Sequence, residues 1–382
     1  MAKHTSRRIF LAGSLGIPAA ALAAESNEPQ VLYRALGKTG LKVSALGFGS
    51  SQVSDPAVIE RAVDLGVNFF DTARSSGGGN NERMIGAALK GKRDKVILGT
   101  KSGAKNARDA LQELNTSLKE LGTDYIDVWY LHSKNSPKDI TDDLLEVQQE
   151  AKKAGKIRFA GVSFHLNMPE VLSHLVKLGR VDVALVSYNF TMEPNVGEAI
   201  REARKSGLGI ATIKAMAGGY ARIERGDKLY GQDPLKLTAR LKQPGAMAAA
   251  LKWVRRNEAV DSAIVGITDF DELAEDIRAI SEPFREEDTK LLARQLEMIR
   301  PLYCRMCGAC GGVCDKGVHV ADTLRCLTYA DGYGQVALAR ERYLQLPDGA
   351  RKIRCADCSV CSVNCPNGVS VRSRLIKAQE LL

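Results

Sequence analysis

Residues 96–131, VILGTKSGAKNARDALQELNTSLKELGTDYIDVWYL, carry the pattern that decides the fold of this chain. A short apolar run at 96–100 is followed by a polar–apolar stretch at 106–121 and by a second apolar run at 126–131. The apolar residues of the middle stretch recur at helical spacing, as Ala110, Leu111, Leu114, Leu118 and Leu121. Two apolar runs joined by an amphipathic helix are typical of parallel strands with a crossover helix.

The same alternation extends in both directions from this unit. Short apolar runs lie at 43–48, 69–72, 96–100, 126–131, 159–163, 183–188, 209–213 and 263–267. Eight strand–helix units in about 250 residues predict an α/β fold of the (β/α)8 TIM-barrel type. We place this barrel at residues 24–297 and a small, mostly helical module at 298–382, in which 321–330 and 335–344 have a helical pattern.

One segment interrupts the alternation after the seventh run. Residues 220–244 are long, charged and punctuated by Gly226, Gly231, Pro234 and Pro244. Because the loops that follow barrel strands lie over the mouth of the barrel, this segment is either a lid or a passive insertion.

Eight of the nine cysteines fall in two short runs near the C-terminus. Both runs have the spacing C-x2-C-x2-C-x3-C, which two-cluster bacterial ferredoxins use to hold 4Fe-4S clusters, the fourth cysteine of each run binding the other cluster. Structural zinc and disulfides are the alternatives, but zinc prefers two separate pairs and cysteines this close pair poorly with one another. We therefore expect a dicluster ferredoxin-like module with two 4Fe-4S clusters, one held by Cys304, Cys307, Cys310 and Cys365 and the other by Cys355, Cys358, Cys361 and Cys314. The ninth cysteine, Cys326, is expected to be a buried thiol.

Composition limits the class of partner. The chain has 382 residues, 45% of them hydrophobic, which is enough for one large core and a smaller module. Its formal net charge is +9, but no Lys/Arg-rich run with interleaved aromatic residues is present, so we expect no nucleic-acid partner. A small-molecule substrate and a redox partner protein are expected instead.

The N-terminus has the features of an export signal. Residues 6–11 read SRRIFL, a short apolar stretch follows, and Ala21-Leu22-Ala23 offers a cleavage site. This pattern is typical of a twin-arginine signal peptide at residues 1–23 and predicts a periplasmic protein. The apolar stretch is short for a membrane span, so a retained anchor is the less favoured alternative, and no stable membrane insertion is expected after the signal is removed. Export of a folded protein suits a chain whose clusters are inserted in the cytoplasm.

Polar residues stand at the ends of three consecutive predicted strands. Asp71, Lys101 and His132 follow the second, third and fourth apolar runs. In a TIM barrel such residues meet at the carboxyl end of the barrel, where catalytic groups lie. A merely structural buried ion pair between Asp71 and Lys101 and an interior role for His132 are the alternatives.

Five motifs resemble those of the aldo-keto reductase family. They are YRALGKTGLKVS at 33–44, LGFG at 46–49, GVNFFDTA at 66–73, NERMIGAAL at 81–89 and YLH at 130–132. The likeness covers about residues 31–280, and the whole chain resembles the subgroup with a C-terminal 4Fe-4S module. The resemblance implies hydride transfer between a nicotinamide cofactor and a carbonyl, with Asp71, Lys101 and His132 as three of the four catalytic residues. The fourth, a tyrosine, is replaced by Ser76, whose hydroxyl is far too weak an acid, so that His132 or a residue of 220–244 would have to substitute for it.

The resemblance also assigns cofactor-binding positions. Ser163 matches a serine that contacts the nicotinamide amide, and Lys214 stands where an aromatic residue often stacks on the ring. Gly266 and Glu275 belong to a loop, 265–276, that has the general shape of the family's adenosine-phosphate loop. Acidic residues at 271 and 272 replace the expected basic clamp and would repel a 2′-phosphate, so NAD is expected over NADP.

The sequence thus leads to an iron–sulfur oxidoreductase of aldo-keto reductase type, which exchanges electrons between two 4Fe-4S clusters and a ligand or nicotinamide at the barrel mouth. The alternative is a ligand-binding or electron-carrier protein without catalytic activity, because the tyrosine is lost. The class of ordinary cytoplasmic carbonyl reductases is disfavoured by both the signal peptide and the serine at position 76.

Overall fold

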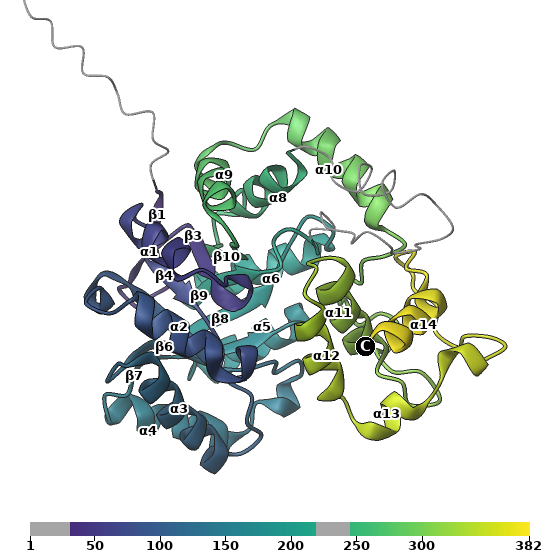
Figure 1. Ribbon diagram of the computed structural model, residues 1–382, viewed down its shortest axis with the longest axis horizontal. Helices are drawn as coiled ribbons and strands as arrows, with labels where there is room; N and C mark the ends of the chain where they lie inside the picture. The colour runs from purple at the N-terminus through teal and green to yellow at the C-terminus, as the bar shows by residue number, and fades with distance from the viewer. Residues whose placement is uncertain (1–30, 219–244) are drawn as a thin grey trace, which may run out of the picture.

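The structure is a computed structural model that describes residues 31–218 and 245–382. The predicted signal peptide at 1–23 and the predicted lid or insertion at 220–244 lie outside the described residues. Figure 1 shows the two parts of the chain, the barrel and the C-terminal module, side by side.

Eight parallel strands close into a barrel, which confirms the TIM-barrel prediction. Each strand pairs with the next along the chain, and the last pairs with the first. The barrel strands are β3 Leu46–Gly49, β4 Phe69–Asp71, β5 Ile97–Ser102, β6 Ile126–Leu131, β7 Ile157–Phe164, β8 Val183–Ser187, β9 Gly209–Ile213 and β10 Ser262–Gly266. Six of them are buried along at least four consecutive residues, as expected for strands covered on both faces.

The first predicted run, 43–48, is divided between two different sheets. Its beginning forms β2 (Lys42–Ser44), which pairs antiparallel with β1 (Tyr33–Ala35), and only its end forms barrel strand β3. The break is held by Ser44, whose Oγ donates to the Leu46 carbonyl at 2.6 Å and whose N–H donates to Asn68 Oδ1 at 2.7 Å. The loop between β1 and β2 approaches β9 closely. A Cβ on Gly37, in this loop, would lie only 2.3 Å from the Gly209 nitrogen. The hairpin therefore closes one end of the barrel with apolar side chains that belong to the inner core.

Helices surround the barrel. They are α1 Pro56–Asp64, α2 Asn80–Ala88, α3 Ala107–Leu121, α4 Asp142–Lys153, α5 Met168–Leu178, α6 Pro194–Lys205, α8 Ala246–Arg255, α9 Phe270–Ser281 and α10 Glu286–Ile299. Helix α3 shows how the sequence sets such bounds. Asn106 Oδ1 accepts the Asp109 N–H at the start of this helix, and Gly122 ends it with a φ of 62°.

The C-terminal module is mostly helical, as predicted. It consists of α11 Val320–Asp331, α12 Val336–Leu344, α13 Asp348–Lys352 and α14 Val371–Leu381, with the one-turn helix η5 Cys355–Asp357. The two stretches predicted as helical, 321–330 and 335–344, coincide with α11 and α12. Cysteines of both runs pack around a small apolar core that includes Val318, Leu324 and Leu375. Within the part of the chain that the structure describes, no helix is both long and apolar enough to cross a bilayer.

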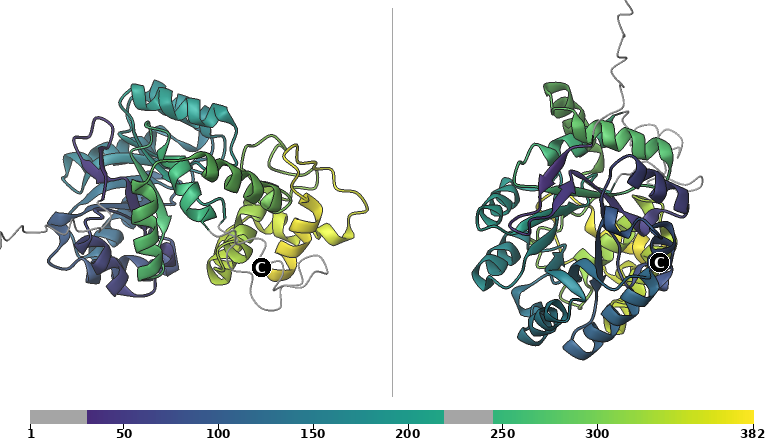
Figure 2. Two further views of the ribbon diagram at one scale, coloured as in Figure 1. Left: turned by 90° about the horizontal axis from the view of Figure 1, so that it is seen from above. Right: turned by 90° about the vertical axis from the view of Figure 1, so that its left-hand side faces the viewer.

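The module lies across one open end of the barrel. The right-hand view of Figure 2 looks along the barrel and shows the yellow-green helices behind its far end. Gly332, after α11, approaches the barrel so closely that a Cβ there would lie 2.5 Å from the Gly218 carbonyl oxygen. Arg342 on α12 donates to Ser75 Oγ at 2.8 Å, and Arg305 pairs with Glu193 at 3.0 Å. The module is thus joined to the barrel loops by polar contacts and close backbone packing.

Candidate active site between barrel and module

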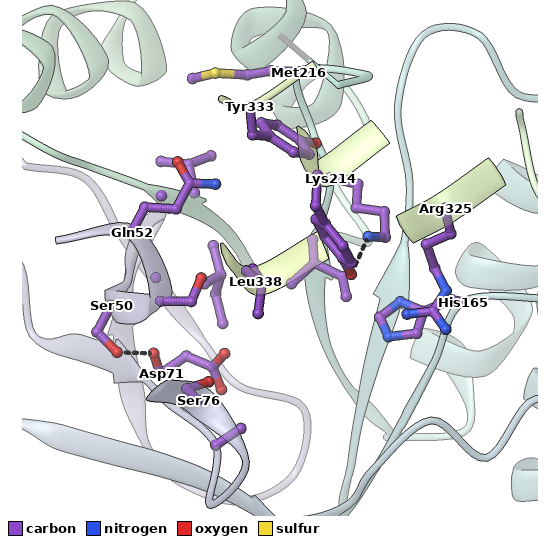
Figure 3. A pocket seen from close by; sticks show the side chains of 18 of the residues that line it. Ser50, Gln52, Asp71, Ser76, His165, Lys214, Met216, Arg325, Tyr333 and Leu338 are labelled. Atoms are coloured by element: carbon purple, nitrogen blue, oxygen red, sulfur yellow. Dashed lines mark hydrogen bonds between the residues drawn. The ribbon is translucent and has the colours of Figure 1, made fainter. Parts of the chain in front are cut away.

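A cavity of about 650 Å³ lies where the module meets the barrel. Its walls are the loops after the barrel strands together with side chains of α11 and α12. Figure 3 shows Asp71 and Ser76 on one side of this cavity and Lys214, His165 and Arg325 on the other. The volume lies within the range that is typical of small-molecule sites.

The predicted ion pair is present at this cavity. Lys101, on β5, donates to Asp71 Oδ2, on β4, and to the Thr72 carbonyl oxygen at 2.6 Å. Burial raises the pKa of Asp71 and lowers the pKa of Lys101, while the attraction between the two charges opposes both shifts. Asp71 Oδ1 is buried without a hydrogen-bond partner among the described residues. An unsatisfied carboxylate oxygen costs free energy, which is tolerated where a site awaits a ligand.

Ser76 lies at the cavity at the start of a one-turn helix, η2 (Ser76–Gly79). The three glycines that follow it all have positive φ, which lets the chain turn back at once into α2. Asn81, in the second position of α2, then fixes this loop. Its side chain accepts from Ser50 Oγ at 2.6 Å and from Thr72 Oγ1 at 2.7 Å, and it donates to the Ser50 carbonyl at 2.6 Å. The motif around Asn81 therefore positions the strand end that carries Asp71.

His132 follows β6 and lines the cavity beside a second histidine, His165, which follows β7. The ring centres lie 6.2 Å apart. Burial lowers the pKa of His132 well below its ordinary value, and Lys101 and Arg342 lower it further. Burial and Lys214 act on His165 in the same direction. Both imidazoles are therefore neutral near neutral pH, and neither is an imidazolium acid.

Lys214 faces a tyrosine of the module across the cavity. It follows β9 with a φ of 60°, an uncommon conformation for a residue with a side chain. Its Nζ donates to the hydroxyl of Tyr329, on α11, at 3.1 Å and lies 4.7 Å from the centre of that ring. Burial alone raises the pKa of Tyr329, but the charges of Lys214 and Arg325 and their hydrogen bonds to the phenol outweigh it and bring the pKa to about 7.

The other three predicted cofactor positions, Ser163, Gly266 and Glu275, do not all reach the cavity. Gly266 ends β10 and lies against Gln52, since a Cβ there would come 2.7 Å from the Gln52 side chain. Glu275, on α9, lines the cavity as well, next to Asp276. Burial raises the pKa of Asp276 well above its ordinary value, and Glu272 and Glu275 raise it further. Ser163 is fully buried, and its Oγ accepts the Ser133 N–H at 3.2 Å. The structure thus brings Lys214, Gly266 and Glu275 to the cavity and leaves Ser163 in the wall behind it.

The eight predicted metal ligands lie in the module, and none of them forms a disulfide. The pKa of Cys304 is raised to about 12 by burial and by the neighbouring Cys310, Cys307 and Cys365. Burial likewise raises the pKa of Cys355, together with Cys358, Cys314 and Cys361. In both cases the thiols that raise the pKa come from the same run and from the last position of the other run. Among residues 31–218 and 245–382, no group of three or more His, Cys, Asp or Glu side chains is placed to hold a metal ion. Cys326 is fully buried, as predicted.

Several residues that line the cavity were not predicted from the sequence. His165 follows Phe164 at the end of a predicted strand, so the rule that selected His132 also applies to it. Tyr329, Arg325 and Arg342 come from the module, and nothing in their local sequence connects them with the barrel mouth.

Comparison with known proteins identifies the barrel. The sequence profile of the Aldo/keto reductase family matches residues 45–297. The L-galactose dehydrogenase of Arabidopsis thaliana is 29% identical over 284 residues, which cover 66% of this chain and 89% of that protein. The L-glyceraldehyde 3-phosphate reductase of Escherichia coli is 26% identical over 310 residues, or 66% of this chain and 88% of that protein. Among solved structures, the holo form of an aldo-keto reductase from Bacillus halodurans superposes with a TM-score of 0.58 at 25% identity, covering 69% of this chain and 96% of that one.

Proposed function

Because the chain belongs to the aldo/keto reductase family, we propose that it is an iron–sulfur oxidoreductase that acts on a small molecule in the cavity between barrel and module. The observation that carries this proposal is the shared cavity, whose walls contain both the family's residues Asp71, Lys101 and His132 and side chains of the cysteine-bearing module. The substrate class that we propose is a polyhydroxylated carbonyl compound or the corresponding alcohol. The names of the relatives from Arabidopsis thaliana and Escherichia coli support this class.

A nicotinamide cofactor suits the cavity. The volume is sufficient for a ligand of this class, and Lys214, Gly266 and Glu275 lie along the cavity walls. When bound, the reduced nicotinamide would supply the hydride of a carbonyl reduction. Lys101 and neutral His132 would donate hydrogen bonds to the substrate oxygen on which negative charge develops.

The acidic end of the cavity predicts the choice between the two dinucleotides. Glu272 and Glu275 line this end, so a 2′-phosphate would meet like charge, whereas ribose hydroxyls would find hydrogen-bond acceptors. NADH is therefore expected to bind about tenfold or more tightly than NADPH, measured by titration calorimetry of the purified protein. Glu275→Lys should narrow this difference. Equal affinities in the native protein would contradict the assignment.

Two 4Fe-4S clusters suit the two thiol sets. A cubane takes one thiolate on each of its four irons, so its ligands are spaced more widely than those of a single ion. N–H donors already point at the sulfurs: the Val318 N–H donates to Cys314 Sγ at 3.3 Å, and Asn367 Nδ2 donates to Cys307 Sγ at 3.4 Å. Such hydrogen bonds are a feature of cluster sites, where they adjust the potential. Clusters held there would supply one-electron transfer between a redox partner protein and the cavity.

Export by the twin-arginine route to the periplasm is the location that we propose. The sequence of residues 6–23 supports it, because this route carries proteins that have already folded around their cofactors.

The cluster assignment is tested by iron and sulfide analysis of protein purified without oxygen. Native protein is expected to contain about eight iron atoms and Cys365→Ala about four, because one cubane loses a ligand. Cys326→Ala is the matched control and should keep about eight.

Electron paramagnetic resonance of the reduced variants tests the crossed ligand sets. Cys304→Ala and Cys365→Ala should leave the same remaining signal, and Cys314→Ala should leave the other. If Cys365→Ala matched Cys355→Ala instead, the sets would be uncrossed. Native protein with far fewer than eight iron atoms per chain would contradict the proposal of two clusters.

A ligand-binding or electron-carrier protein without turnover is the second candidate. The observation that favours it is Ser76, because among the described residues no phenol lines the Asp71 side of the cavity. Anaerobic addition of L-galactose with NAD, or of L-glyceraldehyde 3-phosphate with NADH, separates the two candidates. Turnover or a change in the visible absorption of the clusters supports the oxidoreductase, and the absence of both supports the second candidate.

A further inference from the structure

We propose that Tyr329, on helix α11 of the C-terminal module, is the residue that transfers the proton in the barrel cavity. The inference rests on the proposed oxidoreductase function and deepens it, since it assigns an acid that the described barrel residues at the cavity do not supply. It also makes the module a part of the active site in addition to its role as a carrier of clusters.

The position of Tyr329 is fixed by its contacts with Lys214. Its hydroxyl accepts from Lys214 Nζ at 3.1 Å, and the same ammonium lies 4.7 Å from the centre of its ring. Lys214 is held in turn by Asn189, whose Nδ2 donates to the Lys214 carbonyl at 3.0 Å and to the Tyr303 hydroxyl at 3.1 Å. Tyr303 directly precedes Cys304, so one chain of contacts joins Tyr329 to the first thiol set.

The charged surroundings favour the phenolate. Lys214 approaches from the loop after β9, Arg325 from the preceding turn of α11, and Arg342 lines the same cavity from α12. Asp322 pairs with Arg325 at 2.9 Å, and His165 faces the cavity as a neutral ring. Tyr333 follows the end of α11, and its ring centre lies 6.3 Å from that of Tyr329. The net effect brings the pKa of Tyr329 to about 7, where a phenol both donates and accepts protons readily.

The other candidates at the cavity are less suited to this task. A serine hydroxyl such as that of Ser76 is too weak an acid. Burial raises the pKa of Tyr130, and the charge of Asp71 raises it further, so this tyrosine holds its proton. Burial lowers the pKa of His132 well below its ordinary value, so its neutral imidazole is not an acid of suitable strength. The hydroxyl of Tyr333 accepts the Gly218 N–H at 3.1 Å. Burial and the charge of Tyr329 raise the pKa of Tyr333, so this tyrosine also keeps its proton.

Reduction of a carbonyl to an alcohol needs one hydride, from reduced nicotinamide, and one proton, from Tyr329. The carbonyl carbon gains the hydride with its electron pair, the O–H bond of Tyr329 breaks, and the carbonyl oxygen takes the proton to give the alcohol. The phenolate that remains is stabilised by Lys214 and Arg325 and regains a proton from water. In the oxidation, phenolate accepts the hydroxyl proton as the hydride leaves to oxidised nicotinamide. Reduction should therefore slow as the pH rises through about 7, and oxidation should accelerate over the same interval.

The test is a near-ultraviolet absorption titration of holoprotein, in which tyrosinate formation is followed against pH. Native protein should show one tyrosine that titrates near neutral pH. Tyr329→Phe should lose this titration, Tyr333→Phe should keep it, and Lys214→Met should move it toward the ordinary tyrosine range. With L-galactose and NAD, or L-glyceraldehyde 3-phosphate and NADH, Tyr329→Phe should lower kcat about 10²- to 10⁴-fold relative to Tyr125→Phe, whose ring does not line the cavity.

The two readouts separate failure of this inference from failure of the proposed function. A native protein without a near-neutral tyrosine, or a Tyr329→Phe variant that turns over as fast as Tyr125→Phe, overturns the inference. A native protein that turns over neither probe and shows no change in the visible absorption of its clusters contradicts the proposed function instead, whatever the titration shows. If Tyr329→Phe loses both the near-neutral titration and the turnover, and the control variants keep them, the result supports both the inference and the proposed function.

Discussion

Lys101→Met is expected to lower turnover about 10²- to 10³-fold and to destabilise the fold by about 3–5 kcal/mol at neutral pH. The loss of turnover follows because Lys101 is a charged donor at the cavity, where negative charge develops on a substrate oxygen. The loss of stability follows because Asp71, only 7% exposed, would keep a buried carboxylate without its partner. Initial rates with the two probes and denaturant unfolding measure the two effects.

A double variant separates the chemistry from the packing. Asp71→Asn combined with Lys101→Met removes both charges, so it should recover much of the stability lost in Lys101→Met while turnover stays low. Equal stability of the single and double variants would contradict the penalty assigned to the unpaired Asp71 carboxylate.

The pH dependence of Lys101→Met has a definite sign. Burial raises the pKa of Asp71, and without Lys101 nothing of comparable strength opposes this shift. The folded pKa of Asp71 then lies above the unfolded value, so the penalty is absent in acid, where the carboxyl is protonated in both states, and grows as the pH rises. Unfolding curves of Lys101→Met and native protein should therefore converge at acidic pH.

Arg374→Met is expected to destabilise the C-terminal module by about 3–5 kcal/mol. Arg374, on α14, is fully buried and donates through Nη2 to Asp331 Oδ1, at the end of α11, at 3.1 Å. The variant leaves the Asp331 carboxylate buried, and Lys377, whose Nζ lies 3.6 Å from it, compensates only in part. Arg340→Met is the matched control in the same module, because Arg340 is exposed and donates to the Leu381 carbonyl. We expect its effect to stay within about 0.5 kcal/mol.

The same variant also tests how the module is coupled to the cavity. Helix α11 ends at Asp331 and carries Tyr329, so loosening its attachment to α14 should weaken the near-neutral titration of that tyrosine. Thermal unfolding with the titration as a second signal measures both. An Arg374→Met protein as stable as Arg340→Met would contradict the role assigned to the buried pair.

The barrel was predictable because its strands are buried on both faces and therefore read as continuous apolar runs. The run at 126–131 coincides with β6, and the run at 209–213 coincides with β9. The exception, 43–48, failed because a single polar residue, Ser44, redirects the backbone through hydrogen bonds to Asn68 and Leu46, and hydropathy does not register such contacts.

The active-site side chains were predictable only where the fold itself places them. Parallel strands of a barrel bring their carboxyl ends together, so Asp71, Lys101 and His132 meet whatever the loops do. Tyr329 lies more than a hundred residues from Lys214, on a helix whose position depends on docking of the module, so no spacing rule connects the two. The loss of tyrosine at position 76 was visible in the sequence, whereas its substitute was visible only in three dimensions.

The close passage of Gly332 over Gly218 has a consequence for the history of such chains. A recombination event that placed this module on a different barrel would need a small residue at the position of Gly218. It would also need an equivalent of Lys214 before the tyrosine of the module could transfer a proton. Barrel and module are therefore expected to be inherited as one unit, and exchange of modules between related genes should yield inactive hybrids even when both halves fold.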